Sequence, residues 1–153
     1  TRRPEQVDRV GRALEEAGTY WLSTVRSDGR PHVTTLIAMW NGDALYLSTG
    51  PAEQKCKNLE RNPHCILTTG CNRLDDGLDV VVEGEAVRVT DYARLRALAE
   101  AWDTKYGRDW HLTGSEEDPD YVFEVTPVRA FGFRKGFGKD GQGCQTRWRW
   151  DRS

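Results

Sequence analysis

The chain has 153 residues, 30% of them charged, and a formal net charge of −2. This length predicts one domain over 1–153 with a hydrophobic core of its own. The small net charge gives no reason to expect nucleic acid or a membrane surface as a partner, and no run of 18 apolar residues could span a bilayer. The mean hydropathy of −0.72 indicates a modest apolar supply. We therefore expect the chain to complete its core by pairing with a copy of itself.

None of the four cysteines forms a C-x-x-C pair; they are Cys56, Cys65, Cys71 and Cys144. A zinc cluster could be drawn from the first three and His64, but their spacing matches no metal-site template. Buried reduced thiols are the better interpretation, which predicts a cytoplasmic protein without a metal. Residues 1–17 are charged and amphipathic, which is not the pattern of a signal peptide.

The first elements predicted are a helix and an antiparallel meander. Apolar residues recur at helical spacing between Pro4, which opens the helix, and Gly18, which closes it. Asp28-Gly29 and Asn41-Gly42 are typical of tight hairpin turns, because their glycines supply a positive φ. Three strands are therefore predicted, over 19–25, 31–40 and 44–49.

The third strand leads into the stretch 48–63, which predicts a short helix. Gly50 is the expected N-cap and Pro51 the first helical residue, where the missing N–H costs nothing. Pro63 ends the helix, since it pushes the preceding residue out of the α region. Hydroxyls, free helix N–H groups and two lysines suit an anion, above all phosphate. The alternative is a solvated connecting helix.

The second half of the chain predicts one more helix and a series of strands. Thr90-Asp91 caps the helix and Gly107 ends it. A polar loop follows over 108–120, and Pro127 separates two of the strands. The strands are predicted over 64–69, 80–89, 121–126, 129–134 and 144–150, with a glycine-rich loop over 136–143. Because most connections are hairpin-like, we expect a mainly β fold, an antiparallel barrel with flanking helices.

The charge is unevenly distributed along the chain. Residues 129–152 carry seven Lys or Arg against two Asp, whereas 75–85 carry five acids and no base. A basic face on a nearly neutral chain favours an anionic ligand. Arg147 and Arg149 alternate with Trp148 and Trp150, which offer flat faces to a planar ring. An edge strand protected by charge is the alternative.

No catalytic triad, paired-carboxylate site, metal motif or P-loop is recognisable, and the glycine-rich loop is not a dinucleotide fingerprint. His32 could act as a base or ligand, or be a surface histidine after a turn. Thr34 and Thr35 could bond a ring or phosphate, although threonine is also a good strand former. These residues alone predict an antiparallel barrel with an anion site after the third strand.

Three strings resemble a known family. Within 45–70 the chain reads Y-L-S-T-G-P-x-E-Q-K-x-K-N-L-x-x-N-P-x-C-x-L-T-T-G. This resembles the pyridoxamine 5′-phosphate oxidase-like FMN-binding split-barrel superfamily, and more closely the B-type branch of the actinobacterial flavin/deazaflavin oxidoreductases. The string W-L-S-T-V-R-S-D-G-R-P-H-V-T-T-L is similar to that family's first hairpin, and Q-T-R-W-R-W resembles its last strand. The resemblance covers almost the whole chain.

The resemblance implies a six-stranded split barrel that acts as a homodimer, with a cofactor site at each end of the dimer interface. It implies a flavin-type cofactor, FMN in some members and the deazaflavin F420 in this branch. Matching positions would contact the ring, the phosphate end and the interface side of the cofactor. They are His32, Val33, Thr34 and Thr35 for the ring, Ser48, Thr49, Lys55, Lys57 and Asn58 for the phosphate, and Trp148 and Arg149 near the interface.

The implied activity is hydride transfer from reduced F420 to a small unsaturated or conjugated acceptor. The alternatives are an FMN-dependent oxidoreductase, or a flavin- or heme-binding protein without turnover of its own. The basic C-terminal half favours F420, which carries a phosphate and a polyglutamate tail. The substrate-phosphate residues of pyridoxamine 5′-phosphate oxidases proper are not recognisable here. The catalytic residues and the acceptor stay unknown, the latter because loops over 70–77, 108–119 and 136–143 would form its pocket. Lys55 and Asn58 share a helix face, whereas Lys57 points about 200° away from Lys55.

Overall fold

The computed structural model describes residues 4–112, 119–136 and 144–150, apart from the side chains of 4–8 and 144. It contains three helices and eight strands within those residues. In chain order they are α1 Pro4–Glu16, β1 Tyr20–Val25, β2 Pro31–Leu36, β3 Met39–Asn41, β4 Ala44–Thr49, α2 Gln54–Arg61, β5 His64–Thr69, β6 Leu78–Val89, α3 Tyr92–Tyr106, β7 Tyr121–Arg134 and β8 Cys144–Arg149.

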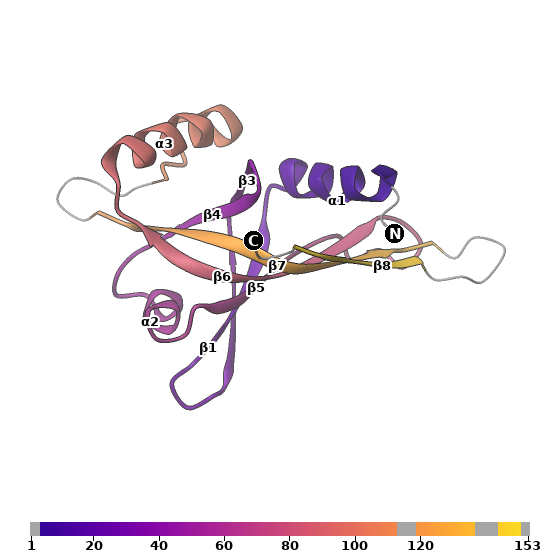
Figure 1. The fold of residues 1–153 in the computed structure, drawn as a ribbon, viewed down its shortest axis with the longest axis horizontal. Coiled ribbons are helices and arrows are strands. Elements are labelled where there is room, and N and C mark those ends of the chain that lie inside the picture. Colours follow the sequence, from indigo (N-terminus) through magenta and orange to yellow (C-terminus); the bar gives the residue numbers. More distant parts are fainter. Residues whose placement is uncertain (1–3, 113–118, 137–143, 151–153) are drawn as a thin grey trace.

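The strands form one antiparallel sheet that curls into a half-barrel (Figure 1). Its order is β2-β1-β5-β6-β7-β4-β3, and β8 pairs with the second half of β7 beyond the end of β4. The buried residues of α1 and α2 belong to one core cluster and those of α3 to another, so α1 and α2 pack on the face of the curled sheet opposite to α3. The predicted fold class is confirmed: the protein is mainly β, antiparallel and consistent with a split barrel. No helix among the described residues is long and apolar enough to cross a membrane.

Two hydrophobic clusters hold the helices to the sheet. Because side chains alternate along a strand, Leu45 and Leu47 of β4 enter one cluster and Tyr46 the other. The first cluster fills the half-barrel and receives apolar residues from α1 and α2. The second cluster lies under α3, whose Trp102 is fully buried there. Strand β4 is therefore apolar on both faces.

The predicted strand over 31–40 is wrong in one respect, because it is divided into β2 and β3. Pairing of β2 with β1 ends at Leu36, opposite Tyr20, where β1 begins. The carbonyl of Ala38 then accepts hydrogen bonds from Tyr106 of α3 and from Lys105 Nζ at 3.4 Å. Side chains of α3 thus replace a strand partner at the break.

The predicted separation of two strands at Pro127 is also wrong, since β7 runs through it. Glu83 pairs with Arg129 and Gly84 with Pro127, so Val128 is the extra residue of a β-bulge. A Cβ on Gly84 would lie 2.6 Å from the Val125 side chain, which explains a glycine at this close approach. The bulge accommodates the missing N–H of proline without ending the strand.

The predicted start of α2 is wrong by three residues. Glu53, not Gly50, is the N-cap, and Pro51 lies in the preceding turn. The Glu53 N–H donates to the Gly50 carbonyl at 3.1 Å, which closes this turn before the helical bonds begin. The helix ends at Arg61, as Pro63 predicts.

Candidate functional site

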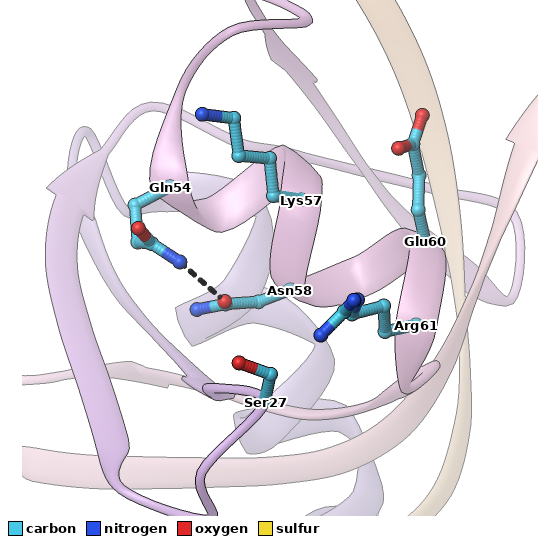
Figure 2. A pocket seen from close by; sticks show the side chains of 6 residues that line it. All are labelled: Ser27, Gln54, Lys57, Asn58, Glu60 and Arg61. Atoms are coloured by element: carbon cyan, nitrogen blue, oxygen red, sulfur yellow. Dashed lines mark hydrogen bonds between the residues drawn. The ribbon is translucent and has the colours of Figure 1, made fainter.

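A pocket of about 300 Å³ lies between α2 and the turn that joins β1 to β2 (Figure 2). Such a volume has room for about ten water molecules. Its lining residues are polar or charged; they are Ser27, Gln54, Lys57, Asn58, Glu60 and Arg61. Lys57 and Asn58 belong to the residues that the sequence predicts for the phosphate end of a cofactor.

Asn58 connects this pocket to the sheet. Its side chain is 2% exposed, and both of its polar atoms are satisfied. Oδ1 accepts a hydrogen bond from Gln54 Nε2 at 2.7 Å, and Nδ2 donates to Thr24 Oγ1 of β1 at 3.0 Å. The amide therefore has one fixed orientation, with α2 held against β1.

Thr24 lies directly opposite His32 of β2 in the strand register, so the two side chains share a face of the sheet. The Nδ1 atom of His32 is buried and has no hydrogen-bond partner among the described residues. The same is true of Arg26 Nε, at the end of β1 beside the pocket-lining Ser27. An unpaired buried polar atom costs about 1–3 kcal/mol, so both atoms favour a polar group arriving from outside the chain.

The other residues of β2 divide between two faces. Thr34 shares the face of His32, whereas Val33 and Thr35 are exposed on the opposite face, as the alternation of a strand requires. Thr34 Oγ1 donates to the Thr35 carbonyl at 3.4 Å. Among the β2 residues, only His32 and Thr34 could therefore contact with their side chains a cofactor ring that lies on the α2 side of the sheet.

A second group of polar residues lies where β4 turns into α2. Thr49 is buried, and its Oγ1 donates to Glu53 Oε2 at 3.3 Å. The same carboxylate forms an ion pair with Lys55. Burial lowers the pKa of Lys55, an effect that the carboxylate of Asp120 opposes. Ser48 is half-buried and points to the other face of β4.

Lys55 and Lys57 are separated, as their spacing predicts, and only Lys57 lines the pocket. Lys55 and Asn58 do not meet there, although they are one helical turn apart. The two predicted phosphate-binding lysines therefore occupy two different surroundings, one paired with Glu53 and one open to the pocket.

Trp148 and Arg149 lie apart from this pocket within one chain. Trp148 is 7% exposed and belongs to the central core cluster. Its ring packs on Gly132, where a Cβ would lie 3.0 Å from the ring edge. Arg149 is exposed. Figure 1 shows β8 at the end of the sheet away from α2, so these residues could join the site only from a second copy of the chain.

Four lining residues are missing from the sequence-based prediction: Ser27, Gln54, Glu60 and Arg61. Arg61 had a local signal, because it lies four residues after Lys57 and so shares its helix face. Ser27 had none, since nothing in the hairpin sequence shows that α2 packs beside it. Most of the glycine-rich loop, 137–143, and part of the loop before β7, 113–118, lie outside the described residues.

The cysteines do not form a metal site in the described part of the chain, which holds no group of three or more His, Cys, Asp or Glu suited to a metal. Cys56 and Cys65 are buried free thiols, and Cys71 is an exposed one. Burial raises the pKa of the Cys65 thiol to about 12, which is the environment of a packed, unreactive cysteine.

Solved structures that share this fold have names that describe different functions. A protein named F420 reductase has 24% identity, covers 78% of this chain and 93% of its own, and has a TM-score of 0.61. The heme storage protein HutZ of Vibrio cholerae has 19% identity, coverages of 90% and 98%, and a TM-score of 0.67. The conserved hypothetical protein Rv2991 of Mycobacterium tuberculosis has 19% identity, covers 88% of this chain and 86% of its own, and has a TM-score of 0.69. At these identities the likeness shows the fold alone.

The family comparison is more specific. No curated protein matches the sequence. The family model of pyridoxamine 5′-phosphate oxidase matches residues 7–133, which is most of the chain and includes β1, β2, β4 and α2. The protein therefore belongs to the pyridoxamine 5′-phosphate oxidase family of split-barrel proteins.

Proposed function

We propose that this protein binds the deazaflavin F420 and transfers a hydride from it to a small unsaturated or conjugated acceptor. The observation that carries the proposal is the polar connection from the α2 pocket through Asn58 and Thr24 to His32. It joins a basic pocket, suited to a phosphate, to a strand with an unpaired buried polar atom. Family membership supports a flavin-type cofactor, and the likeness to an F420 reductase supports the deazaflavin.

In this proposal the protein binds and orients, while the cofactor supplies the hydride chemistry. His32 and Thr34 contact the ring by their side chains, and Val33 and Thr35 by their backbone. Lys57 and Asn58 hold the phosphate end from the pocket, and Thr49 and Lys55 hold it from the start of α2, whereas Ser48 points to the other face of β4. Nothing in the described residues stands out as an obligatory acid.

Two alternatives use the same site differently. An FMN-dependent oxidoreductase would need positive charge only around one phosphate. A heme- or flavin-binding protein without turnover is favoured by the likeness to a heme storage protein. The alternatives differ in which ligand binds tightly and whether a reduced cofactor is consumed.

A homodimer is part of the proposal, and the uncovered face of the sheet supports it. Trp21, Val33 and Phe133 are 38%, 56% and 38% exposed and point to the same face by strand register. On the same face of β7 as Phe133, the ring of Phe131 lies 5.8 Å from the guanidinium of Arg129 and 5.9 Å from that of Arg147. An exposed apolar strip of this kind marks an interaction surface. A second copy on it would bring another Arg149 near this face, because Arg149 lies opposite Arg129 in the strand register, whereas Trp148 faces the core of its own chain.

The experiment that tests the function is a pair of titrations. F420 fluorescence is measured as protein is added at micromolar concentration, and FMN is titrated in the same way. We expect quenching of F420 and weaker binding of FMN. Tight FMN binding without F420 binding would make the proposal wrong. Hemin is the third ligand, and oxidation of pre-reduced F420 by a panel of enones and quinones separates an enzyme from a binding protein.

The cytoplasmic location also remains part of the proposal. The free thiols of Cys56, Cys65 and Cys71 are consistent with a reducing compartment.

A further inference from the structure

We propose that Thr24 is a positioning residue for His32: its hydroxyl proton is directed to the Nδ1 atom of the imidazole, directly or through one water, so that neutral His32 keeps its own proton on Nε2. This tautomer is a property of the chain alone. What the Nε2–H group contacts rests on the proposed function, in which His32 lies beside the cofactor ring. There it donates a hydrogen bond to a carbonyl oxygen or ring nitrogen of the cofactor.

The Thr24 hydroxyl has an unused proton. Its oxygen accepts a hydrogen bond from Asn58 Nδ2 at 3.0 Å, and the hydroxyl donates to no acceptor among the described residues. The side chain is almost fully buried. A hydroxyl can donate one hydrogen bond while it accepts others, and buried polar groups nearly always use this capacity. The proton of Thr24 therefore needs an acceptor on its own side of the sheet.

His32 is the residue directly opposite Thr24 in the register of β1 and β2. Side chains paired in this way have Cβ atoms about 4.5–5.5 Å apart. The imidazole is half-buried, and its buried Nδ1 has no partner among the described residues. A donor without an acceptor thus faces a nitrogen without a partner. Rotation of the hydroxyl joins the two directly or through one water, and such a water is a polar group from outside the chain of the kind that these buried atoms favour.

The surroundings of Nδ1 decide which nitrogen of the imidazole carries the proton. The other buried polar atom without a partner in the described residues is Arg26 Nε, which is also a donor. Arg26 comes two residues after Thr24, so the two side chains project to one face. His32 has no ion-pair partner in the part of the chain that the structure describes. A proton on Nδ1 would therefore meet only donors, whereas a bare Nδ1 accepts from them and leaves the proton on Nε2.

A series of hydrogen bonds links this pair to the pocket. Gln54 Nε2 donates to Asn58 Oδ1 at 2.7 Å, as Figure 2 shows, and this bond fixes the amide with Nδ2 toward Thr24. Because Thr24 Oγ1 accepts from that amide, its own proton points away from Asn58. Side chains of α2, β1 and β2 thus act together to orient the imidazole.

The tautomer can be read directly by NMR on the full chain, isotopically labelled at its histidine nitrogens. Long-range proton–nitrogen correlations distinguish Nε2–H from Nδ1–H, and the measurement is made at about pH 8, where an ordinary histidine is neutral. His32→Gln identifies which of the three histidine signals belongs to His32. We expect the Nε2–H tautomer in the wild type, a mixture of tautomers in Thr24→Val, and recovery in Thr24→Ser, which restores the hydroxyl.

Ser23→Ala is the matched control. It removes the neighbouring hydroxyl, which lies on the opposite face of β1, and should leave the tautomer of His32 unchanged. An Nδ1–H tautomer in the wild type would overturn the proposal. A tautomer that stays the same in Thr24→Val would also overturn it, because a merely structural role of Thr24 would lower the unfolding midpoint without changing the histidine spectrum.

The wild type decides the question if Thr24→Val does not fold. A hydrogen-bonded, buried hydroxyl proton exchanges slowly with water and gives its own NMR signal. We expect such a signal for Thr24, with a through-space correlation to the ring of His32. A hydroxyl proton in fast exchange, or one without this correlation, would contradict the proposed bond.

Titration with F420 separates this inference from the proposed function. We expect binding to be about two- to tenfold weaker for Thr24→Val than for Thr24→Ser, the effect of one neutral hydrogen bond. Equal affinities would show that Nε2–H does not contact the cofactor. An Nε2–H tautomer that depends on Thr24 in a protein that does not bind F420 would support the role of Thr24 and refute the proposed function. Tight F420 binding by a protein with the Nδ1–H tautomer would do the reverse.

Discussion

The side chain of Asn58 donates a hydrogen bond to the hydroxyl of Thr24, which lies 34 residues earlier, at a distance of 3.0 Å. This bond holds α2 to β1 and so positions one wall of the pocket. Both groups are almost fully buried, at 2% exposure each. A small change at this pair therefore affects both the stability of the fold and the shape of the site.

Asn58→Ala should destabilise the protein by about 1–3 kcal/mol, because it leaves the Thr24 hydroxyl buried without its partner. Urea unfolding measures this change. Gln54→Ala is the matched control, since Gln54 is exposed and its partner Asn58 lines the pocket, where water can replace the lost hydrogen bond. We expect a loss below about 1 kcal/mol for the control. Equal losses for the two variants would contradict a special role of the buried bond.

Lys55→Ala should weaken cofactor binding by about 1.5–3 kcal/mol, the contribution of a charge-assisted hydrogen bond. The ion pair with Glu53 adds a second expectation. Glu53→Gln should strengthen binding, because the ammonium no longer has an internal carboxylate partner. Fluorescence titration measures both affinities. An unchanged affinity in Lys55→Ala would remove Lys55 from the site.

Gly132→Ala should destabilise the protein by about 1–3 kcal/mol through overpacking. The added Cβ would lie 3.0 and 3.2 Å from two atoms of the Trp148 ring and 3.4 Å from Val10, so the packed ring must shift by a few tenths of an ångström. Gly11→Ala is the control, since nothing lies within 4 Å of its added Cβ in α1. Alanine there should stabilise the helix by about 0.5–1 kcal/mol. Thermal unfolding distinguishes the two, and a neutral Gly132→Ala would show that Trp148 can shift freely.

Stability should fall as the pH rises above about 10. Burial raises the pKa of Tyr106 from 10.0 to about 12. Between these values the unfolded chain has lost the phenol proton while the folded chain keeps it, so deprotonation favours unfolding. Tyr106→Phe should flatten this part of the stability profile, although it also removes the hydrogen bond to Ala38. The unfolding midpoints of both proteins are measured at about pH 9, 10 and 11, which bracket the ordinary tyrosine pKa. Parallel stability profiles for the wild type and Tyr106→Phe would contradict the raised pKa of Tyr106.

The sequence by itself determined the elements whose signals are local. Gly29 and Gly42 have φ values of +86° and +66°, as the two hairpin turns require. Asp91 caps α3 by accepting from the Ala93 N–H at 2.9 Å, and Gly107 ends that helix with a φ of +79°. Such features depend on the φ preferences and hydrogen bonds of a few neighbouring residues, so the amino-acid sequence is sufficient to predict them.

Only the tertiary structure decided where those elements break and join. The strand over 31–40 is divided because the Ala38 carbonyl bonds to α3. Strand β7 continues through Pro127 because β6 accepts a bulge at Gly84. Both outcomes depend on partners distant in the chain, which no local pattern contains.

The candidate site shows the same division. Hydroxyls and lysines after β4 predicted an anion site, and Lys57 and Asn58 do line a pocket. The sequence did not show that Glu53 forms an ion pair with Lys55, that Ser27 and Arg61 complete the pocket, or that Trp148 packs in the core. Residue type determined which chemistry was available. The packing of α2 on β1, driven by apolar burial and fixed by the bond from Asn58 to Thr24, decided which of those residues meet.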